Sequence, residues 1–377
     1  MGESTSAILE ASQVSQLIDA LARRGYQVVG PTVRDGAIVL EPIETADELP
    51  TGWTDTQKPG SYRLEKRGDE TLFGYNVGPQ SWKKYLHPAD VSLWTAEKQN
   101  GAFRILNNPV PSDRPYTFLG VRACELEAIR VQDRVLLGGA YRDTIYENRR
   151  KGNFLIGVQC TQAADTCFCA SMGTGPRCGE GFDLVLTELV DASRHCFVVE
   201  AGSDRGREVL LELRTRPASE EECGDAEKVV DRAAKQQVRA MQTEGLKDLL
   251  QRNFDHPQWD HVAERCLSCT NCTMVCPTCF CTTVEDSTDV SGEHAERRRH
   301  WDSCFTLSFS YIHGGSVRAS GKARFRQWMT HKLASWIDQF GTSGCVGCGR
   351  CITWCPVGID ITEEVAAIRK GTGNGNA

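Results

Sequence analysis

Two identical cysteine runs constrain this chain more than any other feature. Three thiolates spaced three residues apart on a tight loop can each bind a different iron of one [4Fe–4S] cubane, while the cysteine before the proline is turned away and ligates the other cluster. The runs are Cys266-x2-Cys269-x2-Cys272-x3-Cys276-Pro277 and, 79 positions later, Cys345-x2-Cys348-x2-Cys351-x3-Cys355-Pro356. The pattern therefore predicts two clusters. One would be bound by Cys266, Cys269, Cys272 and Cys355, and the other by Cys345, Cys348, Cys351 and Cys276.

Two other uses of cysteine fit the sequence less well. Structural zinc takes two ligands from each CxxC pair and has no use for a third cysteine at the next step or for a CP ending. Disulfides need an oxidising compartment, and residues 1–25 are polar and amphipathic, without the apolar centre of a signal peptide. No apolar run approaches the ~20 residues of a membrane span. We therefore expect a cytoplasmic protein that binds no membrane. The formal charge of −7 gives no support for nucleic-acid binding.

The remaining length predicts a second domain. At 377 residues the chain is too long for a ferredoxin alone. Residues 116–124 read as a buried strand, 124–137 as a helix and 153–160 as a second strand, with a third at 182–189. This order is typical of a βαβ unit with parallel strands. We expect an α/β domain over residues 1–250 and a ferredoxin-like domain over residues 251–377.

The segment between the two cysteine runs indicates the type of ferredoxin. An apolar stripe at helical spacing extends from Phe325 to Phe340 and stops at Gly341, and a second helix is expected around Thr306 to His313. A minimal ferredoxin joins its two runs by a short link that contains strands. The long helical link here predicts an all-α, two-cluster ferredoxin domain.

Four further cysteines converge in the predicted α/β domain. Cys124 and Cys160 end the first two predicted strands, and parallel strands bring their carboxyl ends to the edge where α/β folds bind ligands. Cys167 and Cys169 follow in the next loop. Together these four predict a third iron–sulfur cluster. The alternative is that Cys124 and Cys160 are small hydrophobic residues at strand ends.

The tetrapeptide Thr-Cys-Phe-Cys occurs twice, at residues 166–169 and 278–281. The second copy follows the first cysteine run and could work with Cys304. Four roles stay open for Cys279, Cys281 and Cys304: a further cluster with one outside ligand, a shell that shapes the sulfur environment of the first run, a thiol site for sulfur substrates, or packing. The cysteines without partner spacing are expected to be incidental; they are Cys178, Cys196 and Cys223.

No catalytic residue is assigned. The chain has no P-loop, HExxH or GxSxG motif, and Gly173-x-Gly175 lacks the third glycine of a dinucleotide fingerprint. Flavin, nicotinamide and hydride chemistry is therefore expected on a partner.

Three segments together carry a resemblance to a known family. They are CLSCTNCTMVCPTCFC at residues 266–281, WDSC at 301–304 and CVGCGRCITWCP at 345–356. The chain resembles the iron–sulfur β subunit of cytoplasmic NiFe sulfhydrogenases, also called hydrogenase/sulfur reductases. The counterpart of this protein in anaerobic sulfite reductase belongs to the same broader family. The resemblance includes the strand end at Cys124 and the loop with Cys167 and Cys169.

The resemblance implies a heteromeric complex. In it a flavin subunit binds FAD and NAD(P), NiFe hydrogenase subunits supply or consume electrons, and this chain relays single electrons between the hydrogenase module and the flavin subunit or a sulfur acceptor. Two alternatives are the counterpart in anaerobic sulfite reductase and a free-standing thiol or polysulfide reductase that uses Cys279, Cys281 and Cys304.

Overall fold

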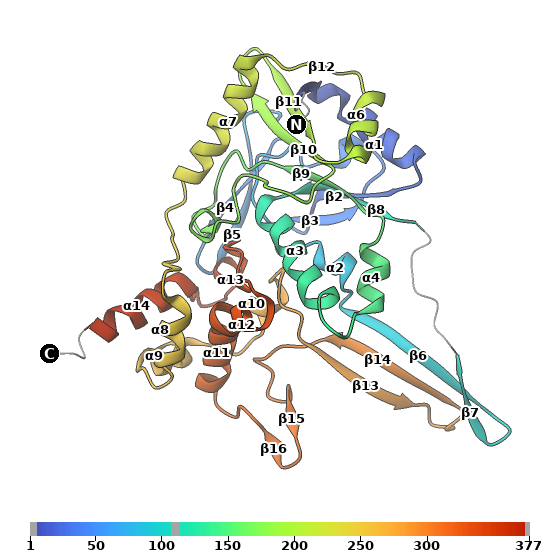
Figure 1. Ribbon diagram of the computed structural model, residues 1–377, viewed down its shortest axis with the longest axis vertical. Coiled ribbons are helices and arrows are strands. Elements are labelled where there is room, and N and C mark those ends of the chain that lie inside the picture. The colour runs from blue at the N-terminus through green and yellow to red at the C-terminus, as the bar shows by residue number, and fades with distance from the viewer. Residues whose placement is uncertain (1–5, 107–113, 374–377) are drawn as a thin grey trace.

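An eight-stranded sheet forms the upper part of the computed structural model, which describes residues 6–106 and 114–373 (Figure 1). The strand order is β12-β1-β11-β10-β9-β8-β2-β3. In chain order the strands are β1 (Ala7–Glu10), β2 (Gln27–Arg34), β3 (Ala37–Pro42), β8 (Tyr116–Val121), β9 (Phe154–Val158), β10 (Leu184–Val190), β11 (His195–Ala201) and β12 (Arg216–Pro217).

The four central strands of this sheet, β2, β8, β9 and β10, run parallel, and the outer strands pair antiparallel. Parallel strands are covered on both faces, which explains why β8 and β9 are nearly continuous apolar runs. Phe118 and Ile156, at their centres, are fully buried. The predicted βαβ unit with parallel strands is confirmed.

Helices cover both faces of the sheet. α1 (Val14–Arg23) and α6 (Asp204–Glu212) pack on one face, and α3 (Ala123–Leu137) and α7 (Glu220–Lys235) pack on the other. The helix predicted to continue as far as Met241 is shorter, because α7 ends at Lys235. Val238 beyond it is exposed, whereas Met241 enters the core of the C-terminal region.

The C-terminal region is helical around the cysteines, as predicted. Its helices are α8 (Leu246–Arg252), α9 (Gln258–Arg265), α10 (Asn271–Met274), α11 (Gly321–Thr330), the π-helix His331–Ser335, α12 (Trp336–Phe340), α13 (Arg350–Thr353) and α14 (Ile361–Gly373). The apolar stripe forms one continuous helical segment that ends at Gly341 with a φ of +68°. The left-handed conformation is easily adopted by glycine, which explains the predicted stop.

The helix expected around Thr306 to His313 is wrong. That segment forms turns and then β15 (Tyr311–Ile312), which pairs with β16 (Gly315–Ser316). Gly314 and Gly315 both have positive φ and close this hairpin. Tyr311 is exposed, so the apolar side chains that mimic a helical face do not enter the core.

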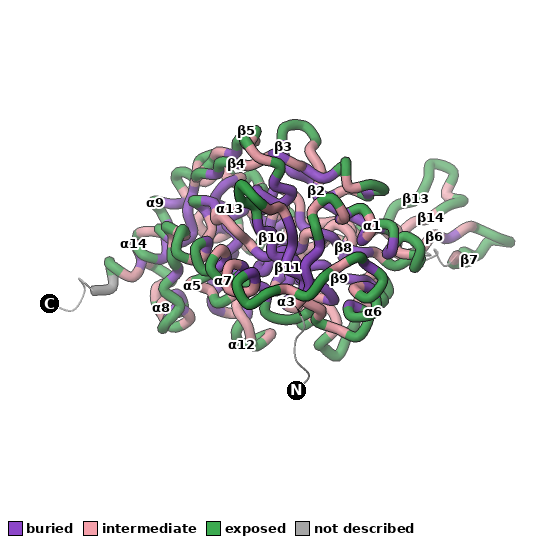
Figure 2. The backbone as a smooth tube through the Cα atoms, turned by 90° about the horizontal axis from the view of Figure 1, so that it is seen from above, coloured by how far each residue is buried: buried purple, intermediate pink, exposed green. Residues whose placement is uncertain are grey.

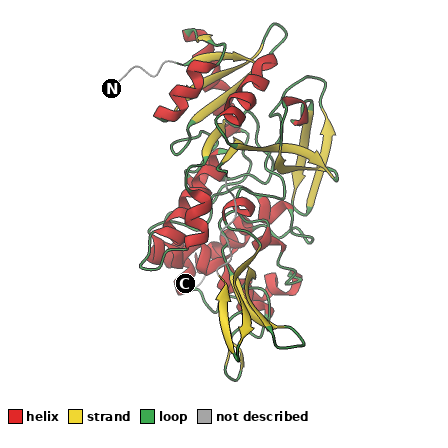
Figure 3. Cartoon of the chain, turned by 90° about the vertical axis from the view of Figure 1, so that its right-hand side faces the viewer, coloured by secondary structure: helices red, strands yellow, loops and turns green. Residues whose placement is uncertain are grey.

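A second sheet joins distant parts of the sequence and projects at the lower right of Figure 1 as an arm. Its order is β13 (Thr282–Thr288), β14 (His294–Trp301), β6 (Asp90–Gln99) and β7 (Ala102–Leu106). The predicted division near residue 250 stays a prediction, and strands from both sides of it share this sheet. The helical region lies between the two sheets (Figure 3).

Burial follows this arrangement. Buried residues concentrate at the centre of the molecule, whereas much of the arm is exposed or half-buried (Figure 2). Over the described residues, no helix has the length and apolar character needed to cross a membrane.

Candidate metal centres

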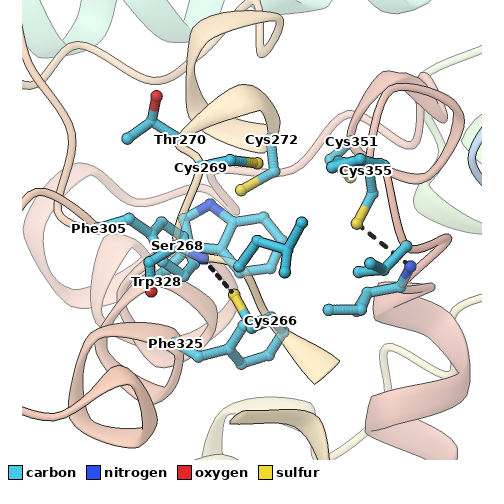
Figure 4. Close-up of a pocket in the computed structure, with 14 residues that line it drawn as sticks. Cys266, Ser268, Cys269, Thr270, Cys272, Phe305, Phe325, Trp328, Cys351 and Cys355 are labelled. Atoms are coloured by element: carbon cyan, nitrogen blue, oxygen red, sulfur yellow. Dashed lines mark hydrogen bonds between the residues drawn. The ribbon is translucent and has the colours of Figure 1, made fainter. Parts of the chain in front are cut away.

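The first candidate centre is a cavity in the C-terminal region (Figure 4). The cysteines that line it are Cys266, Cys269, Cys272, Cys351 and Cys355. Phe305, Phe325 and Trp328 form its apolar wall. The structure thus brings Cys355 of the second run to the three leading cysteines of the first run.

Backbone amides donate to the sulfurs of this centre. The N–H of Ser268 donates to Cys266 Sγ over 3.4 Å, and the N–H of Ile359 donates to Cys355 Sγ over 3.3 Å (Figure 4). Burial, together with the neighbouring thiolates, raises the pKa of Cys272 well above its ordinary value. Cys269 is exposed, so this centre reaches the molecular surface.

The second candidate centre lies deeper. Cys345, Cys348 and Cys276 are buried side chains, each 9% exposed. Burial, followed by the negative charges of these three thiolates, raises the pKa of Cys351. The structure therefore groups Cys276 of the first run with the three leading cysteines of the second run.

The third candidate centre is a cavity at the carboxyl ends of β8 and β9. All four cysteines predicted for a third cluster line it: Cys124, Cys160, Cys167 and Cys169. Cys124 lies in the first turn of α3, Cys160 directly follows β9, and Cys169 begins α5 (Cys169–Met172). The side-chain amide of Gln237 donates to Cys169 Sγ over 3.2 Å.

The third centre adjoins the second. Cys348 of the second run also lines the third cavity. At Gly347, a Cβ atom would lie 2.6 Å from the Cα atom of Cys169. Such a distance is too short for any side chain, so glycine at residue 347 lets the two cysteine loops pack backbone against backbone.

A buried guanidinium lies between these two centres. Arg350 donates to the carboxylate of Glu125 over 2.5 Å and to the carbonyl of Gly78 over 2.9 Å. It interacts electrostatically with both Cys348 and Cys124. Its Nη1 has no hydrogen-bond partner among the described residues. Because a buried donor is costly to leave unpaired, this nitrogen favours an anionic acceptor at the site.

Arg122 is a second buried guanidinium. Its side chain donates to the carbonyls of Phe73 and Tyr75, each over 2.8 Å, and to that of Gln159 over 3.2 Å. Burial raises the pKa of Cys160, and the charge of Arg122 opposes that rise. Arg122 therefore favours the thiolate form of Cys160.

Two buried lysines lie beside the second centre. Lys332, in the π-helix, donates to Cys276 Sγ over 3.3 Å and to the carbonyl of Gly344 over 2.9 Å. Burial opposes its charge, but the thiolates of Cys276 and Cys279 outweigh burial and raise the pKa of Lys332. Lys83 donates to the carbonyl of Cys279 over 3.0 Å.

The three cysteines with open roles form two different contacts. The Cys279 thiol shares a hydrogen bond with Cys276, which, together with nearby cations, lowers the pKa of Cys276. The Cys281 thiol shares a hydrogen bond with Cys304, which lowers the pKa of Cys281 to about 7. The cysteines expected to be incidental lie elsewhere: Cys178 in the sheet core, Cys196 in β11 and Cys223 in α7.

The basic residues were missed by the sequence analysis. Arg350 stands inside the second run and Arg122 two residues before Cys124, so their spacing to cysteine was an available signal. Lys83 and Lys332 are far from any ligand in the sequence, and only the fold brings them to the second centre.

The chemistry of the three sites fits iron–sulfur clusters. Thiolate is the ligand type that these clusters use. Backbone amides directed at sulfur, together with buried cations, compensate a negatively charged group. The unpaired Nη1 of Arg350 indicates the same kind of occupant.

Comparisons with known proteins agree with this chemistry. Residues 265–359 match the family model described as a 4Fe-4S dicluster domain. The chain is 31% identical over 351 residues to a protein of Pyrococcus furiosus named sulfhydrogenase 2 subunit beta, covering 92% of this chain and 93% of that protein. No solved structure matches the chain.

Proposed function

Because the chain belongs to the family of sulfhydrogenase β subunits, in which it is an iron–sulfur electron-transfer subunit of a heteromeric assembly, we propose that it relays electrons within a cytoplasmic NiFe hydrogenase complex. Its partners in this proposal are NiFe hydrogenase subunits and a subunit that binds flavin and NAD(P). The electrons pass to that flavin subunit or to a sulfur acceptor.

One observation carries the proposal: three groups of cysteines adjoin one another in a row. Cys351 lines the first cavity and belongs to the second group, and Cys348 joins the second group to the third cavity. Iron–sulfur clusters, when bound, accept and release one electron each. The row of cysteines supports a continuous path through the chain.

The ligands that we propose follow this grouping. They are Cys266, Cys269, Cys272 and Cys355 for the first cluster, Cys345, Cys348, Cys351 and Cys276 for the second, and Cys124, Cys160, Cys167 and Cys169 for the third. The buried bases hold the surrounding charge: Lys332 lies at the second site, and Arg350 lies between the second and third. Cys279 acts on the ligand Cys276 by hydrogen bonding and so shapes its sulfur environment.

The exposed end of the path is at the first site. Cys269 and Leu267 are exposed there, and Val357 beside them is 41% exposed. Apolar surface around a redox centre is suited to contact with another protein of the complex. We therefore assign this edge to electron exchange with a partner.

Anaerobic purification of the tagged full chain from its natural host tests the assignment. Copurification of a flavin subunit together with a nickel-containing large subunit is expected. A sirohaem subunit in their place would overturn the hydrogenase assignment in favour of sulfite reductase. Sulfur or thiol reduction by the chain without partners would overturn the relay role.

An iron count tests the third site separately. Three clusters require about twelve irons per chain. A value near eight in fully loaded protein would contradict the third cluster and leave the other two in place.

A further inference from the structure

Cys281 and Cys304 stand apart from the three cysteine groups as a contacting pair. Their thiols share one hydrogen bond. Neither residue lines the first or the third cavity described above. Ligands of one cubane bind different irons around its periphery, whereas these two sulfurs face each other directly.

The backbone holds the two residues together. The antiparallel ladder of β13 and β14 ends at Thr282 opposite Trp301. Cys281 continues the ladder by one residue, because its carbonyl accepts from the N–H of Asp302 over 2.9 Å. Cys304 follows two residues later, on the same side of the hairpin end, so the pairing of the strands fixes the contact.

A tight turn positions Cys304 further. The hydroxyl of Ser303, which is fully buried, shares a hydrogen bond of 2.8 Å with the hydroxyl of Thr273 in α10. The same hydroxyl accepts from the N–H of Phe305 over 3.1 Å. The turn that carries Cys304 is thus anchored to the cysteine loop of the first site.

From this geometry we propose that Cys281 and Cys304 form a redox-active dithiol–disulfide couple beside the first and second iron–sulfur sites. Oxidation forms one Sγ–Sγ bond, releases the protons held by the two thiols and gives up two electrons. The electron balance closes with two oxidised [4Fe–4S] centres that take one electron each, so in the assembled complex the couple rests on the proposed function. A dithiol exchange reagent can replace those centres in the test.

The surroundings support thiol–disulfide exchange. The ammonium of Lys332 favours the thiolate form of both cysteines. Thiolate is the species that attacks a disulfide. Cys281 is half-buried and Cys304 is 9% exposed, which places the more accessible sulfur at Cys281.

Equilibration of the loaded full chain tests the couple. Under anaerobic conditions the chain is held in a series of reduced and oxidised dithiothreitol mixtures, quenched in acid, alkylated and digested with trypsin without reduction. The linked peptides are residues 266–297 and 300–318, and fragmentation locates the bond. We expect a Cys281–Cys304 bond whose disulfide-to-dithiol ratio changes tenfold for each tenfold change in the buffer ratio, as a two-electron couple requires.

Matched variants separate the couple from a metal site. Cys281→Ser and Cys304→Ser should each abolish the linked peptide and leave the iron content equal to that of the parent. Cys223→Ser, in α7, should change neither. Absence of the bond at the oxidising end, a bond to a different cysteine, or a loss of about four irons in either variant would overturn the proposal. Low iron in the parent with an intact disulfide titration would instead count against the proposed cluster number alone.

Discussion

Gly347 lies directly against the backbone of Cys169, although 178 residues separate them in the sequence. The N–H of Phe168 also donates to the carbonyl of Gly347 over 2.9 Å. This contact joins the loop of the second cysteine run to the loop of the third site. It makes the spacing between two proposed clusters a property of backbone packing.

Gly347→Ala is expected to separate these loops. A Cβ atom would lie 2.6 Å from Cys169 Cα, and the φ of +63° adds strain. The strain costs about 1–2 kcal/mol, and forced repacking adds roughly 1–3 kcal/mol. The apparent melting temperature and the iron content should both fall. Gly341→Ala, which has a similar φ of +68° and open space around it, is the control. Equal effects in the two variants would contradict the role of the contact.

Cys355→Ser should damage the first cluster before the second. The sulfur of Cys355 lies in the cavity lined by Cys266, Cys269 and Cys272. We expect a loss of about four irons and the disappearance of one electron paramagnetic resonance signal in the reduced protein. Cys276→Ser should remove the signal of the other ferredoxin-type cluster. Loss of the same signal in both variants would contradict the exchange of ligands between the runs.

Cys124→Ala should empty the third site and spare the other two. Iron is expected to fall from about twelve to about eight per chain. Cys178→Ala provides the control, since Cys178 is equally buried but lies in the core under the sheet, outside the third cavity. The prediction fails if the two variants hold the same amount of iron.

Arg350→Met should destabilise the chain more than its removal together with Glu125. The two charged groups form a buried pair, and removing one partner leaves an uncompensated charge at a cost of about 3–5 kcal/mol. The double variant Arg350→Met with Glu125→Gln should recover part of the loss in melting temperature. Arg297→Gln, at the exposed pair with Asp286, should cost less than about 1 kcal/mol. A double variant less stable than Arg350→Met would contradict this account of the buried pair.

The sequence predicts what depends on local spacing. The two cysteine runs, the parallel strands that end near Cys124 and Cys160, and the helical stop at Gly341 all follow from patterns within a few residues. Chain connectivity alone cannot place Lys83 and Lys332 together, because each reaches the second site from a distant helix. The sheet of β6, β7, β13 and β14 is non-local for the same reason. Around Thr306 the helical spacing was misleading, since Gly314 and Gly315 favour a hairpin.

The exposure of Cys269 has a consequence for handling the protein. The edge that is available to a partner protein is equally available to dioxygen when the partner is absent. Oxidative damage in air should therefore begin at the first site and advance inward, and an isolated chain should lose its outermost redox signal first. Assembly into the complex would then protect the chain by covering a few residues around Cys269, with no change in its interior.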